Sequence, residues 1–450
     1  MAGGCAPSRG PGSPEPADRC RIGAPTVFGL VPQPLAIVVA EPGGGQADDS
    51  PAAWFDRLLL RQQYATLVVV DCEGGIVAGA ADHWTSDRAG RSWTFTLRPG
   101  QQFADGSALD APAVAANWQR DRSDSTRWPG VTALTVLGPD RLRVELALPL
   151  ADPGLFFDPG FALGGPATSE GTSLASGTHG RVGVPAPTLP PGGQRIMLEP
   201  NRLFPDRPPL DVELLPRGTD HRDLLDVRRA SPRPVSGMHL TRDPRAVSYA
   251  QAVGEWRAIP LAWDRTYVLT VRTAEGTGSR PAEAELAAMA RDVVPGDARA
   301  AAGPFWWRQD ENCLLAAPPM LPVGRQVAYD RTDAVARALA ERIVALAVAG
   351  DAQPWLPGAL RSAPAGPDQA RAVPMDPVAL RRGIMAGTVV AAVTAVPALR
   401  RPGCAGAPPR LTGGVEIPLV QTRGWALVRG ALPPIVLLGD GTFLLTGAVR

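Results

Sequence analysis

The feature that most constrains the fold is the stretch WTFTLRPGQQFADGSALDAPAVAANW, which runs from Trp93 to Trp118. Its first five residues alternate between apolar and polar, which is the period-2 pattern of a half-buried strand. Pro-Gly and Asp-Gly pairs then mark turns on either side of a short extended piece. Asp110 is a good N-cap for a helix over 111–118, with Pro112 in the first turn, where its missing N–H is harmless. The stretch therefore predicts a strand, two turns and a helix.

Any strand–turn–helix unit could share this pattern, but the residues also resemble the signature of the family 5 extracellular solute-binding proteins, the peptide- and nickel-binding type of the ABC importers. The matching positions are Trp93, Thr94, Phe95, Leu97, Arg98, Gly100, Phe103, Asp105, Gly106, Leu109, Ala111 and Val114. Segment 77–90, VAGAADHWTSDRAG, is similar to the family's lead-in to this signature. The resemblance implies an α/β fold of the two-lobed periplasmic-binding-protein type (class II-like) with an inserted β-rich subdomain.

The resemblance also implies that the chain leaves the first lobe and later returns to it. The expected segments are a flexible tether at 1–20, the first part of lobe I at 21–60, the β-rich subdomain at 61–158, the second part of lobe I at 159–268, lobe II at 269–420 and the return to lobe I at 421–450. Residues 263–269 resemble the segment where related proteins cross from the first lobe to the second.

The function implied by the resemblance is capture of a small, peptide-like solute by hinge closure, followed by delivery to an ABC permease in the membrane. It implies a monomer without cofactor, metal or nucleic acid, and without covalent chemistry. Peptide-binding relatives hold the ligand's amino group with an Asp-Tyr-Pro-Asp-Pro-like loop, and residues 350–400 contain no such motif, which puts peptide as the ligand in doubt. Two alternatives stay open: a degenerate member that acts as a sensor or adaptor, and a secreted hydrolase on an unrelated fold.

Composition excludes several kinds of chemistry. The 450 residues carry a formal charge of +1, which does not indicate a nucleic-acid surface. All 45 basic residues are arginine, so there is no phosphate-loop lysine, Schiff-base lysine or Ser–Lys dyad. The sequence also has no G-x-S-x-G elbow and no H-E-x-x-H motif. Asp220, His221 and Asp223 could touch a metal, but the start of a solvated helix explains them more simply.

The five cysteines, at 5, 20, 72, 313 and 404, form no C-x-x-C pair. Cys5 follows small residues and precedes a stretch rich in Pro, Gly and Ser, which resembles the end of a bacterial lipoprotein signal, although a charged start and an apolar core are missing. Cys5 is therefore a candidate for lipidation, and we expect a periplasmic or cell-surface location. The other four cysteines allow two disulfides in an oxidising compartment, with the pairing left open. No apolar run reaches the roughly 20 residues that span a bilayer.

Periodicity predicts several further elements. The continuous apolar run LAIVVA at 35–40 is typical of a strand covered on both faces. A hairpin is expected at 131–148, around Gly138-Pro139-Asp140, and a long helix at 330–349. Residues 415–429 indicate two short strands on either side of Arg423-Gly424-Trp425, and 435–445 a final hairpin.

A solute cleft between two lobes needs aromatic walls and a few charged groups that converge when the lobes close. The candidate walls are Trp263, Tyr267, Trp355 and Trp425, and the candidate charged anchors are Asp264, Arg265 and Arg423. Each of these side chains could instead serve packing or the surface.

Overall fold

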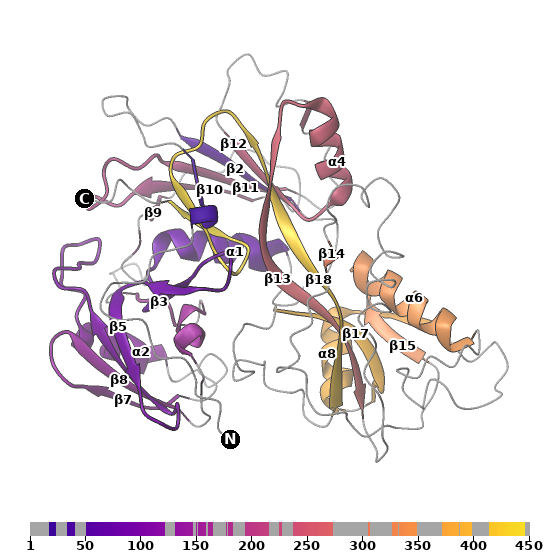
Figure 1. Cartoon of the computed structure of the whole chain (residues 1–450), viewed down its shortest axis with the longest axis horizontal. Helices are drawn as coiled ribbons and strands as arrows, with labels where there is room; N and C mark the ends of the chain where they lie inside the picture. Colours follow the sequence, from indigo (N-terminus) through magenta and orange to yellow (C-terminus); the bar gives the residue numbers. More distant parts are fainter. Residues whose placement is uncertain are drawn as a thin grey trace, which may run out of the picture.

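A computed structural model gives the fold of the chain (Figure 1). The residues that it describes are 18–23, 34–40, 51–121, 131–146, 150, 152–158, 161–164, 177, 179–182, 194–215, 225–226, 237–272, 305–306, 326–331, 333–348, 371–386, 388–397 and 414–445. Cys5, Trp355, the cysteines at 313 and 404 and the acidic cluster at 220–223 lie outside these ranges, as does most of the expected tether.

One large sheet runs through both lobes and joins them. Its strand order is β16-β15-β17-β13-β18-β12-β2-β11-β10-β9, with β14 (Phe305–Trp306) beside β18. The two central strands, β13 (Arg257–Arg272) and β18 (Gly414–Arg429), are antiparallel and sixteen residues long. One end of this pair belongs to the lobe I half of the sheet and the other end to the lobe II half (Figure 1). We call the place where they pass between the halves the crossing (residues 263–265 and 421–424).

In lobe I, helices cover both faces of this half of the sheet. Its strands are β2 (Leu35–Ala40), β9 (His179–Val182), β10 (Gln194–Pro200), β11 (Leu210–Leu214) and β12 (Gly237–Thr241). Helix α1 (Pro51–Gln63) packs on the face that carries Ala426 and Val428, and α4 (Pro244–Val253) packs on the face that carries Trp425 and Leu427. Because successive residues of a strand point to opposite faces, the two helices lie on opposite sides of the sheet.

Strand β2 confirms the prediction from its continuous apolar run. It lies between two parallel neighbours, β11 and β12, and both of its faces are covered. Parallel strands buried in this way have few polar positions, which is why the run shows no alternation.

Lobe II repeats this arrangement on a smaller scale. Strands β15 (Gln326–Asp330), β16 (Arg371–Met375) and β17 (Ala391–Pro397) extend the sheet beyond β13. Helix α6 (Ala334–Val348) packs on the face of Val327 and Val393, and α8 (Pro377–Ala386) packs on the face of Ala328 and Ala392. The long helix predicted at 330–349 is thus confirmed, and begins four residues later than expected.

The β-rich subdomain is a four-stranded sheet covered by one helix. Its order is β5-β6-β8-β7, formed by β5 (Ala81–Ser86), β6 (Ser92–Leu97), β7 (Val131–Val136) and β8 (Arg141–Leu146). Helix α2 (Ala111–Asp121) and the short helix η2 (Pro153–Phe157) complete its core. There Trp118 lies edge-on to Phe161 and Phe95 edge-on to Phe156. The strand and helix predicted from 93–118 and the hairpin predicted at 131–148 are therefore confirmed.

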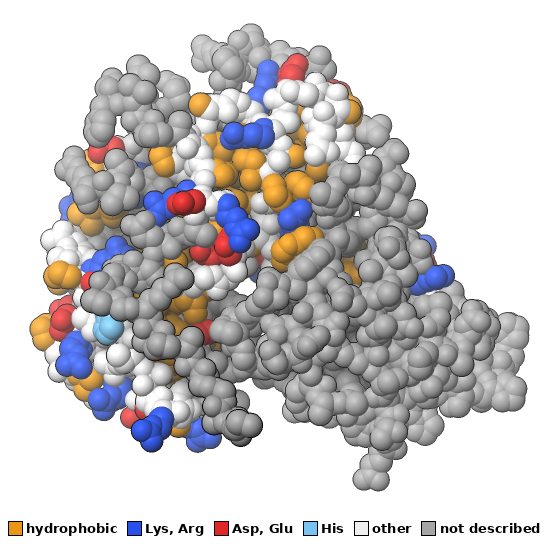
Figure 2. Space-filling view, viewed as in Figure 1, with side chains coloured by type: hydrophobic (Ala, Val, Ile, Leu, Met, Phe, Trp, Pro, Cys, Tyr) orange, Lys and Arg blue, Asp and Glu red, His pale blue; other side chains and the backbone are white. Residues whose placement is uncertain are grey.

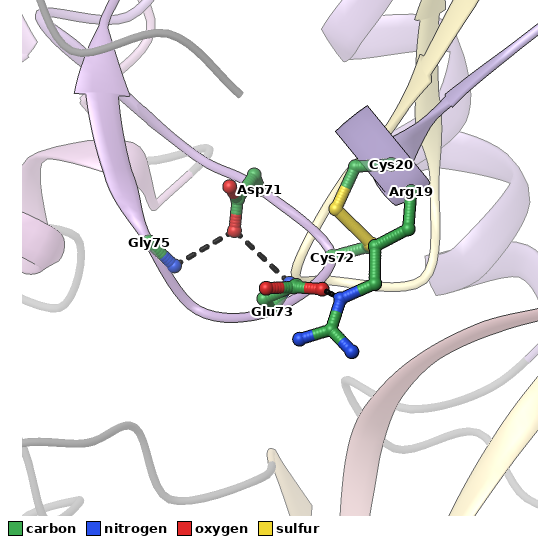
Figure 3. Close-up of a disulfide and its surroundings, with 6 residues drawn as sticks. All are labelled: Arg19, Cys20, Asp71, Cys72, Glu73 and Gly75. Atoms are coloured by element: carbon green, nitrogen blue, oxygen red, sulfur yellow. Dashed lines mark hydrogen bonds and ion pairs between the residues drawn. A yellow bond between two sulfur atoms is a disulfide. The ribbon is translucent and has the colours of Figure 1, made fainter. Parts of the chain in front are cut away.

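The two ends of the described chain meet where the subdomain joins lobe I. A three-stranded sheet contains β1 (Arg21–Ile22), β19 (Ile435–Leu437) and β20 (Phe443–Leu445). A disulfide links Cys20, in the short helix η1 (Asp18–Cys20), to Cys72, in the turn between β3 (Val68–Val70) and β4 (Ile76–Ala78). The same turn is held by the Asp71 carboxylate, which accepts from the Glu73 and Gly75 N–H groups (Figure 3).

One sequence prediction is wrong. Residues 415–429 form a single strand, β18, and not two short strands around Arg423-Gly424-Trp425. Gly424 does not make a turn because it is buried in the strand against Trp54, where an added β-carbon would lie 2.8 Å from Cη2 of the indole. A glycine in a strand often marks such a close approach of another group. The domain boundaries given above stay predictions.

Candidate functional site

The carboxyl ends of two neighbouring parallel strands in lobe I lead to helices on opposite faces of the sheet. β2 leads to α1 on one face of the sheet, and the adjacent parallel strand β12 leads to α4 on the other face. In open α/β sheets, ligands bind in the crevice outside the carboxyl ends of the strands where the connections diverge in this way. The fold therefore indicates a binding site at the end of β12, next to the crossing.

The strands of the crossing are irregular at this crevice. Thr241, the last residue of β12, pairs with Trp425 of β18. The part of β18 that precedes Trp425, with the part of β13 that pairs with it, therefore extends past the end of β12. The β13–β18 register shifts between Pro260 and Trp263, and again between Trp263 and Arg265. Such bulges bend a strand and increase its twist, and they are common beside functional sites. In the space-filling view, the described surface is hollowed between lobe I and the β-rich subdomain, and basic and acidic side chains gather at the rim (Figure 2).

A buried ion pair holds the lobe I side of the crossing. The Arg242 guanidinium, directly after β12, donates to both carboxylate oxygens of Asp264, with an Nη1–Oδ1 distance of 2.9 Å. The two side chains are only 7% and 2% exposed. The guanidinium also lies over the indole of Trp54, 4.7 Å from the ring centre. The Trp54 Nε1–H in turn donates to the Gly441 carbonyl at 3.0 Å, which joins the first turn of α1 to the final hairpin.

A second group of side chains stacks along one face of the crossing. Arg423 lies directly opposite Trp263 in the β13–β18 pairing, and Trp425 is two residues further along the same face of β18. The Arg423 guanidinium carbon lies 4.4 Å from the Trp263 ring centre and 4.8 Å from that of Trp425. Burial lowers the pKa of Arg423 from its ordinary value. This packing places one cation within cation–π distance of two indoles.

A third group ties the crossing to lobe II. The Tyr267 hydroxyl donates to the Asp333 carboxylate, at 2.9 Å from Oδ2. Asp333 also accepts from the Val335 and Ala336 N–H groups, so it caps α6. Burial raises the pKa of Asp333, and the charge of Arg265 opposes this rise. Burial likewise raises the pKa of Tyr267, with the Asp333 charge adding to the effect.

The structure brings six of the seven candidate residues together, and Trp355 lies outside the described residues. Trp263, Asp264, Arg265 and Tyr267 lie within five residues of β13. On β18, Arg423 lies opposite Trp263, and Trp425 lies opposite Pro260. Asp264, Arg265, Tyr267 and Trp425 are buried, whereas Trp263 and Arg423 are partly exposed. Their roles in binding stay predictions, and exposure makes Trp263 and Arg423 the two that a solute can reach.

Sequence reasoning missed Arg242 and Trp54, which build this site with the candidates. Arg242 precedes an Asp-Pro helix start and looks like an ordinary solvated residue in the sequence. Its partner Asp264 is 22 residues away, and Trp54 comes from a different helix. No local pattern could have revealed these contacts.

The described residues contain no group of three or more His, Cys, Asp or Glu side chains that could hold a metal ion. No helix among them combines the length and the apolar character that crossing a bilayer requires.

Comparisons with known proteins agree with this architecture. Residues 75–174 match the family described as bacterial extracellular solute-binding proteins, family 5 Middle. Over 56 residues the chain is 38% identical to the nickel-binding periplasmic protein of Escherichia coli (strain K12). That alignment covers 12% of this chain and 11% of the relative, so the sequence match spans only about a tenth of the relative's length.

Two solved structures share the fold over nearly the whole chain. NikA from Brucella suis, in complex with Fe(III)-EDTA, is 15% identical with a TM-score of 0.57, over 90% of this chain and 98% of that one. The Escherichia coli murein tripeptide binding protein MppA is 14% identical with a TM-score of 0.54, over 92% of this chain and 99% of that one. The fold is thus that of the two-lobed periplasmic binding proteins, as predicted. The family 5 signature expected from the sequence at 93–114 lies within the matched segment, 75–174.

Proposed function

We propose that this chain is the extracytoplasmic solute-binding component of an ABC importer, which captures a small solute by closing its two lobes. The observation that carries this proposal is the pair of long strands, β13 and β18, which alone among the described strands run from one half of the sheet into the other beside the crevice. Two lobes joined in this way can rotate about the crossing while each keeps its own core.

Closure needs no covalent step. A solute shifts the equilibrium between open and closed lobes only by the difference in its affinity for the two forms. Contacts made by both lobes at once supply that difference, and the crossing is where side chains anchored to each lobe lie next to one another. The chain therefore acts as a binding protein and not as an enzyme.

The solute is a small molecule and can be peptide-like. Among the similar proteins, NikA is in complex with a chelated metal, Fe(III)-EDTA, and MppA is a murein tripeptide binding protein. Trp263 and Arg423 supply the wall and the charged contact, while Asp264, Arg265, Tyr267 and Trp425 hold the strands that present them. Trp355 of lobe II is a further candidate wall. The partners are this solute and an ABC permease, and the chain acts as a monomer.

The location is the periplasm or the cell surface. The Cys20–Cys72 disulfide supports an oxidising compartment. Lipidation of Cys5 would tether the protein to the membrane beside its permease, through the stretch rich in Pro, Gly and Ser that follows.

The experiment compares the protein as purified with the same protein after its solute has been removed by unfolding, dialysis and refolding. Mass spectrometry identifies the small molecule released, and small-angle X-ray scattering measures the radius of gyration with and without it. We expect a smaller radius with the solute, because the lobes close. An unchanged radius together with no released molecule would contradict the proposal.

Two further readouts separate the alternatives. Uptake of the identified solute, labelled with an isotope, should fall in cells that lack the gene, whereas a sensor or adaptor would leave uptake unchanged. The solute should also leave the protein chemically intact after long incubation, whereas a secreted hydrolase would convert it.

A further inference from the structure

We propose that the tip of the final hairpin (Gly439-Asp440-Gly441) transmits the position of the β-rich subdomain to the crossing, and thereby sets the affinity of the protein for its solute. The inference rests on the proposed function, because it concerns how closure of the lobes is controlled. It is carried by the two cores that the hairpin joins, by the contacts on either side of its tip and by the two glycines that make those contacts possible.

The first strand of the hairpin is shared between two hydrophobic cores. Val436 of β19 and Leu438, the residue after it, pack in the core of the β-rich subdomain. Ile435 and Leu437 pack in the core of lobe I. Because successive residues of a strand point to opposite faces, this one short strand forms part of the wall of both cores. Protein interiors are close-packed and transmit strain, so a shift of the subdomain relative to lobe I moves the strand and the tip that follows it.

The subdomain contacts one side of the tip. Leu438 pairs with Asp71 in an antiparallel bridge, and the Gly439 N–H donates to the Val70 carbonyl at 2.9 Å. A β-carbon added at Gly439 would lie 2.8 Å from Cγ1 of Val70 and 3.0 Å from the Asp71 carbonyl oxygen. Val70 itself belongs to the subdomain core. The tip therefore touches β3 so closely that a side chain at Gly439 would push the two apart.

The crossing contacts the other side of the tip. The Gly441 carbonyl accepts from the Trp54 Nε1–H at 3.0 Å. A β-carbon added at Gly441 would lie 2.7 Å from Oδ2 of Asp264, which is closer than non-bonded atoms approach one another. Asp264 is the partner of Arg242 and lies at a register shift of β13. A displaced tip therefore displaces the ion pair that holds the lobe I side of the crossing.

The tip is rigid enough to transmit such a displacement. The Asp440 carboxylate accepts from the Thr442 N–H and hydroxyl, at 3.2 and 2.6 Å, and from Arg61 Nε at 2.8 Å. The Gly441 N–H donates to the Leu438 carbonyl at 3.1 Å, which closes the turn. These bonds fix the spacing between the side of the tip that touches the subdomain and the side that touches the crossing.

The position of the crossing matters for binding because both lobes must contact the solute at once. A solute favours the closed form only by the difference in its affinity for the two forms. A displaced Asp264 changes the angle at which the lobes meet and weakens the contacts that they make together. Coupling between two sites of a protein typically changes affinity by about 5- to 150-fold.

The test uses five full-length proteins purified side by side: wild type, Gly439→Ala, Gly441→Ala, Gly180→Ala and Gly100→Ala. Gly100→Ala is the matched control for Gly441→Ala, because the two φ angles are +75° and +76° but a β-carbon at Gly100 would meet nothing within 4 Å. Gly180→Ala is the matched control for Gly439→Ala, because neither glycine has a left-handed φ and a β-carbon at Gly180 also meets nothing within 4 Å.

Mass spectrometry identifies the small molecule released from wild type, and tryptophan fluorescence measures its affinity for each protein. We expect Gly439→Ala and Gly441→Ala to bind it about 5- to 150-fold more weakly than wild type, whereas both controls should match wild type. Urea unfolding without the molecule measures stability separately. Alanine at a positive φ is strained, so Gly100→Ala should lose stability as Gly441→Ala does, yet keep its affinity.

Wild-type affinity in folded Gly439→Ala and Gly441→Ala would overturn this inference and leave the proposed function intact. Weaker binding in only one of these two variants when both fold, or an equal loss in the controls, would overturn it as well. If Gly441→Ala does not fold, Gly439→Ala decides alone, because its substitution adds no backbone strain. A wild-type protein that holds no small molecule and shows no change in scattering would overturn both the inference and the proposed function.

Discussion

The buried pair of Arg242 and Asp264 allows a quantitative test of how the crossing is held. Replacing Asp264 with Asn keeps the shape of the side chain but removes its charge, so the Arg242 guanidinium stays buried without its counter-ion. The two side chains are 7% and 2% exposed, and water cannot easily compensate. Removing one partner of a buried pair typically costs about 3–5 kcal/mol in the free energy of unfolding. The Trp54 ring 4.7 Å away recovers only part of this, since a cation–π contact contributes about 2 kcal/mol when desolvated.

Urea unfolding at pH 7, followed by far-UV circular dichroism, measures the loss as a lower midpoint for Asp264→Asn. The control is Glu341→Gln, which breaks the exposed pair with Arg337 on α6 and should cost no more than about 0.5 kcal/mol. A double variant, Arg242→Met with Asp264→Leu, should regain most of the loss, because apolar replacement of both partners leaves no buried charge unpaired. If the free energy of unfolding of Asp264→Asn lies within about 0.5 kcal/mol of wild type, the pair does not stabilise the crossing.

Three further predictions concern other parts of the chain. Cys72→Ser removes a disulfide between residues 52 apart, so the free energy of unfolding should fall by about 4 kcal/mol. Adding reductant should cause an equal loss in wild type and none in the variant, if the disulfide is the cause. Burial, with the charge of Arg207 adding to it, lowers the pKa of His179 to about 4 from the ordinary 6.5, although a hydrogen bond to Pro208 opposes the shift. The contribution of neutral His179 to the free energy of unfolding is therefore complete above pH 6.5 and falls by about 3 kcal/mol as the pH drops to 4. This pH-dependent loss should be absent when His179→Gln is titrated in parallel. Tyr267→Phe should cost about 1–3 kcal/mol, because it removes the hydroxyl that donates to the buried Asp333 carboxylate and leaves only the backbone donors of α6. It should retain the co-purified solute, since Tyr267 is 2% exposed, and loss of solute at unchanged stability would contradict this.

Local chemistry explains which parts of the fold could be predicted from the sequence. Alternation at 93–97 and an N-cap at Asp110 act within a few residues, and the structure has the strand and the helix that they indicate. The continuous apolar run of β2 and the helical spacing of the apolar residues in α6 also follow directly from burial. Such signals depend on the period of the element and not on what packs against it.

The position of the candidate site along the chain could be predicted from the sequence, but the contacts that form the site could not. The resemblance put residues 263–269 at the passage between lobes, and β13 does run there. The contacts that fix these residues come from far away in the chain: the Trp54 donor and its Gly441 acceptor are 387 residues apart. The continuity of β18 depends on the same helix, because Gly424 reads as a turn until the indole beside it is known. Spacing along the chain carries no information about such pairs.

The anchoring of neighbouring residues locates the bend of the crossing. Asp264 is bound to Arg242, which belongs to lobe I, whereas Tyr267 is bound to Asp333 at the start of α6 in lobe II. The register shift between Trp263 and Arg265 falls between these two attachments, where the strand ladder is interrupted and bending costs the fewest hydrogen bonds. If the lobes close as proposed, we expect their rotation to be concentrated at 264–265. Trp263 and its partner Arg423 lie beside that point, so a solute that contacts them touches the place where a small change in strand angle moves all of lobe II.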